Sequence, residues 1–445
     1  MLFRLHTSIL ISCLLSIGLA SVLVAERAYC LMTAGTIFAL VTQMGLLMNF
    51  LQNEEDLFTE KTLFFTTLFY SFLLGNIFMA ISYYYDGDTF MFSKNDAMFY
   101  LTNSMKVEDI GFLGNVKRIT NIYDPEDCGA LILDSLMMSF VPSKYFLNAF
   151  YMLTGATSAV LLYRIGAHFM SNMYAFTAAL AYGTSSFLIF FHCTFLKESF
   201  FVFLVICAMY FFYKAIIFGY YWSYLVTILF VGLIMFFRPA VSAMLVLSFI
   251  IYFAISQHGS AASFFIYLIA GISFVAFLAK MQDMMNRYTG GDIEAMQESS
   301  AVGSYSSGFS YFVSLFAGPF GPFPSLFPKE VNVPASLNFY GSGLSYRLFL
   351  IFPFWFGVYF ALKRHMTKLV PMLTFILVEM LAASMVLASL ELRKVLLHIP
   401  FMFILTFYGL YEWERDKEAE IPHRLPESIW FITAIIILVV WNVIR

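Results

Sequence analysis

Runs of about 20 apolar residues recur along this chain and restrict it to folds that place helices across a lipid bilayer. A helix needs roughly 20 apolar residues to cross the hydrocarbon layer, and the chain has about thirteen such runs. Phe, Leu and Ile fill the runs without strict alternation, which favours helices over the strands of a membrane barrel. The runs cover residues 7–25, 28–51, 62–84, 146–165, 173–192, 199–218, 221–237, 239–256, 261–279, 345–362, 369–389, 395–411 and 428–444. The sequence therefore predicts an all-α, polytopic membrane helical bundle with about 13 transmembrane helices.

The charge content supports this class and excludes others. Only 12% of the residues are charged, about half the share in a soluble domain. The net charge of -3 argues against nucleic acid as a partner. No Gly-rich phosphate loop is present, so we do not expect this chain to drive transport with ATP. Membrane lipids are its expected surroundings.

Two long connections interrupt the spans. The first, a loop over 85–145, follows the third span and is rich in acids. The second covers 280–344 and is rich in Gly and Ser before it becomes apolar over 309–328. Proline cannot sustain a spanning helix at the density found there, so 309–328 is interpreted as a Pro-rich re-entrant or interfacial segment.

The basic residues of short loops predict which end of the bundle faces the cytoplasm. The clearest signal is Lys363, Arg364 and Lys368 in one short loop, which the positive-inside rule places in the cytoplasm. Alternation from this loop brings Arg164 and Lys214 to the same side. Both long connections are then expected on the outer face, which in a bacterial inner membrane is the periplasmic side.

The same alternation gathers ionisable residues at outer helix ends. Charge beside hydrocarbon is costly, so such residues serve a site or extend to the headgroups. The outer turns carry Lys197, Glu198, Arg238, Arg393 and Lys394, and His398 follows within one helical turn. The long loop adds three carboxylates and a tyrosine: Asp86, Asp88, Asp96 and Tyr100.

Carboxylates beside a cationic lining suit one chemistry well. Arg and Lys hold the anionic head of a lipid-linked phosphate, and a carboxylate acts as general base towards an acceptor hydroxyl. We expect Asp96 to be the base, with Asp88 as the second choice. The cations of the outer turns, with Tyr100, Glu198 and His398, would bind substrate. Asp86, Asp88 and Asp96 leave a divalent cation open as a cofactor, although their spacing fixes no ligand set.

With these residues in view, the chain resembles the GT-C superfamily of polytopic glycosyltransferases, and most of all the bacterial relatives of the dolichyl-phosphate-mannose protein mannosyltransferases. In that family a span runs into a long first outer loop with an essential Asp, often followed by a Tyr; Asp96 to Tyr100 fits this pattern. Phe195 to Ser199 resembles the family's next turn, which pairs an acid with a base, and Phe237-Arg238-Pro239 resembles a later helix start. The paired Asp-Glu common in the mannosyltransferases is absent, because Asn95 and Ala97 flank Asp96.

The resemblance implies a domain organisation and a reaction. Residues 62–279 would form a shared seven-helix module that includes the outer loop 85–145. Residues 1–61 would be an N-terminal hairpin, 280–344 a second outer loop and 345–445 a C-terminal four-helix module. The implied activity is inverting transfer of a sugar from a polyprenyl-phosphate-linked donor to a glycan or lipid acceptor in cell-envelope assembly.

Two alternatives stay open. The first is a polymerase or ligase that joins lipid-linked oligosaccharides, whose working residues tend to be Arg and His. The second is a lipid or polysaccharide transporter, which would show internal repeats and ionisable residues at mid-membrane. No repeat is obvious, and Lys214 and Glu379 are the main charges within spans.

Overall fold

The computed structural model describes residues 59–89, 94–123, 125–256, 347–387 and 396–418, with isolated positions near 40 and at 432 and 436. Within these residues every element is a helix, which confirms the predicted all-α class. The elements are α3 (Glu60–Asp86), α4 (Lys94–Met105), α5 (Val107–Ile122), α6 (Pro125–Phe140), α7 (Lys144–Gly166), α8 (Asn172–Gly183), α9 (Ser186–Cys193), α10 (Glu198–Phe218), α11 (Tyr221–Met235), α12 (Pro239–Ser256), α17 (Arg347–Lys363), the 3-10 helix η3 (Thr367–Leu369), α18 (Val370–Leu387) and α20 (Ile399–Glu418). The predicted runs before residue 59, at 261–279 and at 428–444, and the Pro-rich segment 309–328, lie outside the description apart from those isolated positions.

Four of the described helices are long and apolar enough to cross a membrane: α3, α7, α10 and α12. The bent pair α8 and α9 raises that number to five if it counts as one span. Helices α11 and α17 are apolar but shorter. These spans agree with the predicted runs, whereas the predicted total of about thirteen is not confirmed.

One predicted span, 173–192, is broken rather than continuous. Helices α8 and α9 meet at an angle of 47°, and the break falls in the sequence Gly183-Thr184-Ser185-Ser186. The Thr184 hydroxyl donates to the Leu180 carbonyl at 2.7 Å, so a side-chain donor bonds to a backbone carbonyl at the end of α8. Gly and Ser pairs are frequent causes of sharp helix kinks, and this local chemistry accounts for the bend.

The spans place their polar ends at two opposite ends of the bundle. Helices α3 and α7 are antiparallel, so the start of α3 meets the end of α7, where Arg164 forms an ion pair with Glu60 at 2.7 Å. At the other end, the start of α10 meets the start of α12, where Arg238 contacts Glu198. We refer to these two ends of the bundle as the Arg164 end and the Arg238 end.

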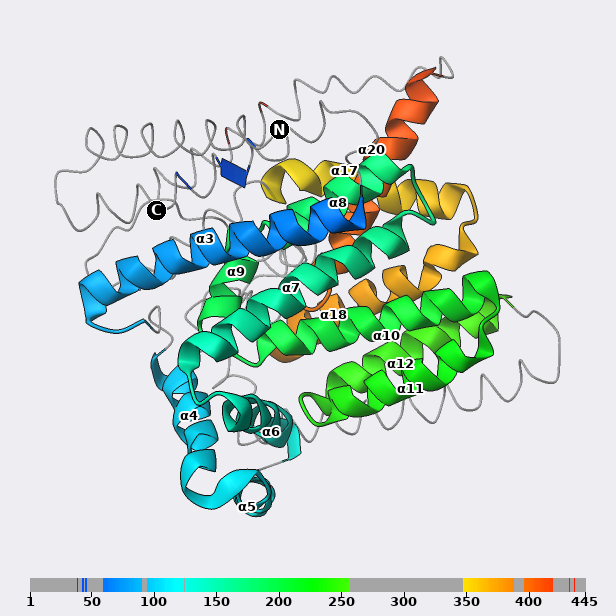
Figure 1. The fold of residues 1–445 in the computed structure, drawn as a ribbon. Helices are drawn as coiled ribbons and strands as arrows, with labels where there is room; N and C mark the ends of the chain where they lie inside the picture. Colours follow the sequence, from blue (N-terminus) through cyan, green and yellow to red (C-terminus); the bar gives the residue numbers. More distant parts are fainter. Residues whose placement is uncertain are drawn as a thin grey trace.

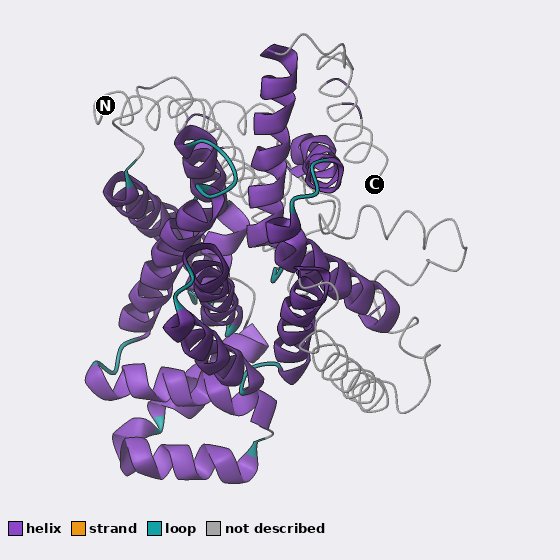
Figure 2. Ribbon diagram, turned by 90° about the vertical axis from the view of Figure 1, so that its right-hand side faces the viewer, coloured by secondary structure: helices purple, strands orange, loops and turns teal. Residues whose placement is uncertain are grey.

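The loop 85–145 is largely helical. Helices α4, α5 and α6 form a group beside the start of α7, at the lower left of Figure 1. Figure 2 shows this group at the lower end of the bundle. A polar network joins the three helices: the Asn115 amide donates to the Asn103 carbonyl at 3.0 Å and to the Ser135 hydroxyl at 2.9 Å. Arg118 donates to the side chains of both asparagines. These bonds satisfy buried polar groups and fix the mutual position of the helices.

The C-terminal helices are held by close backbone contact and by ion pairs. A Cβ atom added at Gly357 of α17 would lie 1.9 Å from the Leu405 carbonyl oxygen of α20, so glycine is required where these helices cross. Arg364 forms ion pairs with Glu412 and, at 2.8 Å, with Asp416. Small residues at a crossing and charges at helix ends are the usual means of joining membrane helices.

Candidate functional site at the Arg238 end

Helix α4 presents the residues that the sequence placed at the centre of the site. Asp96 lies in the first turn of α4 and is exposed, while its neighbour Ala97 is fully buried. Tyr100 follows one turn later, and residues four apart in a helix lie on the same face. The buried Ala97 and Leu101 pack with Met138 of α6, with Leu147 and Tyr151 of α7, and with Phe195. This packing anchors α4 against the bundle and leaves the Asp96 carboxylate accessible.

The turn between α9 and α10 brings Lys197 to α4. Phe195 has a φ of 56°, a left-handed conformation that costs a non-glycine residue of order 1–3 kcal/mol. Its side chain is fully buried, and this burial holds the turn in place. The Lys197 ammonium consequently lies 6.0 Å from the centroid of the Tyr100 ring. Residues about 100 positions apart in sequence therefore meet at one face.

Arg238 joins the same face through Glu198. The Glu198 side chain is 5% exposed and one of its oxygens lies 3.5 Å from an Arg238 nitrogen; the other oxygen has no hydrogen-bond partner among the described atoms. Arg238 is 33% exposed, and its guanidinium also lies 5.9 Å from the Phe201 ring centroid. A guanidinium has five donors, and this single long contact leaves most of them available to an anion.

A close backbone contact connects α6 to the Arg238 turn. The Gly129 amide donates to the Phe236 carbonyl at 3.0 Å, and a Cβ atom at Gly129 would lie 2.6 Å from that oxygen. Only glycine allows this approach. The group α4–α6 is thus tied to both turns that carry the cations.

A buried carboxyl lies behind this face. Asp134 of α6 is 1% exposed and accepts a hydrogen bond from the hydroxyl of Tyr151 in α7. Tyr151 lies within electrostatic range of Tyr100 and Glu198. Burial raises the pKa of Asp134 to about 7, against the opposing effect of the Tyr151 hydrogen bond.

The raised pKa of Asp134 makes stability depend on pH. Because the folded carboxyl holds its proton up to about pH 7 and an unfolded one loses it near 3.8, stability falls as pH rises between these values. The cost of ionising Asp134 reaches at most about 4 kcal/mol above pH 7. We expect Asp134→Asn to flatten the decline in thermal unfolding temperature between pH 5 and pH 8. Parallel declines in the wild type and the variant would contradict this account.

The structure describes two further predicted site residues, Asp88 and His398. Asp88 lies in the turn after α3 and is partly buried, and its backbone carbonyl accepts from the Ser82 hydroxyl at 2.9 Å. Thr89 in the same turn accepts from Lys144 at 3.0 Å, which ties the turn to α7. His398 is fully buried and is hydrogen-bonded to Glu379 of α18. Arg393 and Lys394 lie outside the described residues.

The structure brings Lys197 to Tyr100 and Arg238 to Glu198, and Asp96 lies one helical turn before Tyr100 on α4. Among the described side chains, no group of three or more His, Cys, Asp and Glu residues is arranged to hold a metal ion. The Asp86 side chain is outside that description, so the divalent cation that the sequence left open stays untested.

Sequence reasoning missed the Asp134–Tyr151 pair. A signal was present, because Asp134 is the only charge in the apolar stretch Ala130 to Phe140, and a lone acid among apolar residues is seldom buried without a partner. The partner, Tyr151, could not be predicted from the sequence, because it comes from another helix.

Comparison with known proteins agrees with the sequence motifs. Residues 133–281 match the family model described as dolichyl-phosphate-mannose-protein mannosyltransferase, and this stretch runs from α6 through α12. No curated protein and no solved structure matches the chain. The match confirms the predicted resemblance over residues 133–281, which are similar to the mannosyltransferases of the GT-C type.

Proposed function

We propose that this protein transfers a sugar from a polyprenyl-phosphate-linked donor to a glycan or lipid acceptor at the Arg238 end of the bundle. The family match supports a membrane glycosyltransferase with such a donor. The observation that carries the assignment is the contact of Lys197 with Tyr100 on α4, the helix that also bears the exposed Asp96. Glu198, the residue after Lys197, is paired with Arg238. Cations that hold a phosphate beside an accessible base meet the needs of this reaction.

The proposed roles follow from exposure and charge. Arg238 and Lys197 bind the donor phosphate, and Glu198 orients Arg238 through its buried carboxylate. The Asp96 carboxylate accepts the proton of the acceptor hydroxyl as that oxygen forms a bond to the anomeric carbon. The bond from this carbon to the phosphate oxygen breaks, and the lipid phosphate leaves as an anion held by the two cations. Attack opposite to the leaving phosphate inverts the anomeric centre.

We further infer that the Arg238 end faces the periplasm of a bacterial inner membrane. The support is the positive-inside assignment of the loop with Lys363, Arg364 and Lys368, together with the structure, in which Lys368 interacts electrostatically with His168 beside Arg164. The opposite end, with α4–α6, is then outside, where a product would enter cell-envelope glycans.

A transfer assay tests the function. Wild-type protein in proteoliposomes should consume one member of a panel of polyprenyl-phosphate hexoses and release the polyprenyl phosphate. Folded protein that consumes none of them would oppose the proposal. The face is tested separately with Leu113→Cys, since Leu113 in α5 is 80% exposed. A membrane-impermeant maleimide should label it in intact spheroplasts, and protection there would place the site in the cytoplasm.

A further inference from the structure

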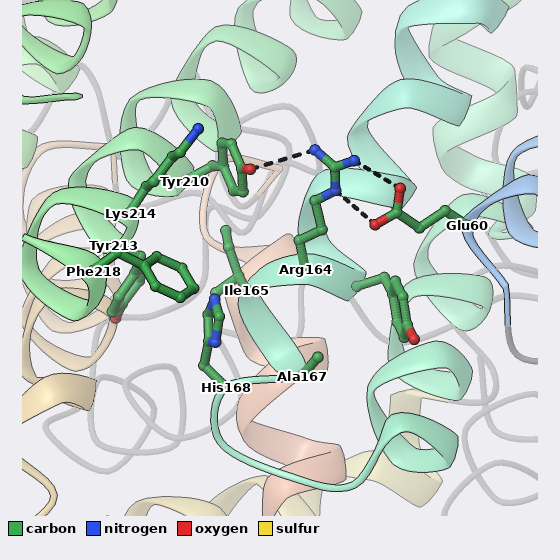
Figure 3. A pocket seen from close by; sticks show the side chains of 10 residues that line it. Glu60, Arg164, Ile165, Ala167, His168, Tyr210, Tyr213, Lys214 and Phe218 are labelled. Carbon is green, nitrogen blue, oxygen red and sulfur yellow. Dashed lines mark hydrogen bonds and ion pairs between the residues drawn. The ribbon is translucent and has the colours of Figure 1, made fainter. Parts of the chain in front are cut away.

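A second charged cavity lies at the Arg164 end, opposite the proposed transfer site. It has a volume of about 300 Å³ and lies between the start of α3, the end of α7 and the last turns of α10. Figure 3 shows Arg164, Tyr210, Lys214 and His168 around it. The proposed transfer reaction uses none of these residues.

The cavity is lined by one carboxylate, Glu60, and by two cations, Arg164 and Lys214. Arg164 donates to both oxygens of Glu60 at 2.7 Å and to the Tyr210 hydroxyl oxygen at 3.4 Å. Glu60 therefore neutralises Arg164, and Lys214 adds a further positive charge to the lining. Because Tyr210 accepts from Arg164, its own hydroxyl proton is directed elsewhere and can be donated to a ligand. Burial and the nearby Lys368 hold the pKa of His168 below its usual value.

Exposed aromatic residues place the cavity at the depth of lipid headgroups. Phe218 lines the cavity, and it is followed at the turn into α11 by Tyr220, Tyr221 and Trp222, of which the last two are about 80% exposed. Tyr and Trp concentrate where the membrane meets water. The Lys214 ammonium lies 5.5 Å from the Tyr220 ring centroid, so this cation lies at the same level.

We propose that this cavity binds the phosphate headgroup of an anionic phospholipid, with Lys214 and the Tyr210 hydroxyl as donors and the Arg164–Glu60 pair as a fixed wall. Basic pockets between membrane helices recognise such headgroups. The exposed Phe218 and the apolar face of α11 beyond it, with Leu225, Ile228 and Leu229 exposed, offer the acyl chains a continuous apolar path. A soluble phosphate would gain nothing from that path.

Lipid retention measures this site directly. Purified protein in neutral detergent is titrated with phosphatidylglycerol or with zwitterionic phosphatidylcholine, and bound lipid is counted by native mass spectrometry. Wild-type protein should bind phosphatidylglycerol preferentially, and Lys214→Gln should weaken this binding at least about fivefold, the factor expected for one cation at an anionic surface. Lys214→Arg keeps the charge and should restore most of the affinity. Lys61→Gln is the matched control, because Lys61 is exposed at the same end and does not line the cavity.

Three results would overturn the proposal. The first is that Lys214→Gln binds phosphatidylglycerol as tightly as wild type. The second is that Lys61→Gln weakens binding as much as Lys214→Gln, which would indicate attraction to the general surface charge. The third is that wild type binds phosphatidylglycerol no better than phosphatidylcholine, while inorganic phosphate raises the unfolding temperature of wild type but not of Lys214→Gln. The ligand would then be a soluble phosphate. None of these results bears on sugar transfer, so the two proposals fail separately.

Discussion

Replacing Asp96 with Asn is expected to lower the rate of sugar transfer by roughly 10²–10⁴-fold, the usual contribution of a general base. The amide keeps the size of the side chain but cannot accept the proton of the acceptor hydroxyl. Asp96 is exposed in the first turn of α4, so the loss of its charge should cost less than about 1 kcal/mol of stability. Donor turnover in proteoliposomes and the thermal unfolding temperature measure the two effects.

Asp109→Asn is the matched control for this experiment. Asp109 is an exposed acid in the first turn of α5, within the same helical group, and its replacement should leave turnover unchanged. Asp88→Asn tests the second candidate base. Full turnover by Asp96→Asn would remove Asp96 from the mechanism, and loss of turnover in Asp88→Asn alone would transfer the role to Asp88.

Replacing Arg238 with Gln is expected to weaken donor binding by about 10–100-fold, because a charge-assisted contact to a buried phosphate contributes about 1.5–3 kcal/mol. The same change leaves the Glu198 carboxylate buried without its cation, so stability should fall as well, by up to about 3 kcal/mol. Affinity for a donor analogue and thermal unfolding are measured on the same preparation.

A double variant separates these two effects. Arg238→Gln with Glu198→Gln removes both charges, so stability should recover while donor affinity stays low. Lys117→Gln is the matched control, since Lys117 is an exposed cation of α5 near the same end. If the double variant regains donor affinity together with stability, Arg238 acts only as a partner of Glu198 and the proposed phosphate contact is wrong.

The sequence predicted the spans and the sorting of charged ends well, because both depend on local composition. An apolar run of about 20 residues specifies a span by its length alone. Because consecutive spans cross the membrane in opposite directions, Lys197 and Arg238 must lie at one end of the bundle. Arg164 and Lys214 must lie at the other end. The structure shows this sorting, because Arg238 contacts Glu198, the residue after Lys197, and because Arg164 and Lys214 line one cavity.

Features that depend on contacts between residues far apart in the chain could not be predicted from the sequence. The sequence presented 85–145 as a loop, because the network of Asn103, Asn115 and Arg118 that fixes α4–α6 is visible only after folding. Nothing in the sequence indicated that His398 contacts Glu379, because the two side chains come from different segments of the chain. Lys214 was counted as a charge within a span and instead lies one turn from the end of α10, at a cavity.

The buried Glu379–His398 pair bears on the transporter alternative, because ionisable pairs within membrane bundles occur in transport pathways. Both side chains are almost completely buried, and the described cavity at the Arg164 end does not include them. A structural pair between α18 and the turn before α20 accounts for these observations, and the family match supports a transferase.

The position of the donor phosphate is the central claim, and a structure with a bound polyprenyl-phosphate sugar analogue tests it most directly. We expect the phosphate within ion-pair distance of Arg238 and Lys197, with the sugar directed towards Asp96 on α4. A phosphate bound at the Arg164 end, with none beside Arg238, would contradict the proposed site and would assign the donor to the cavity at Lys214.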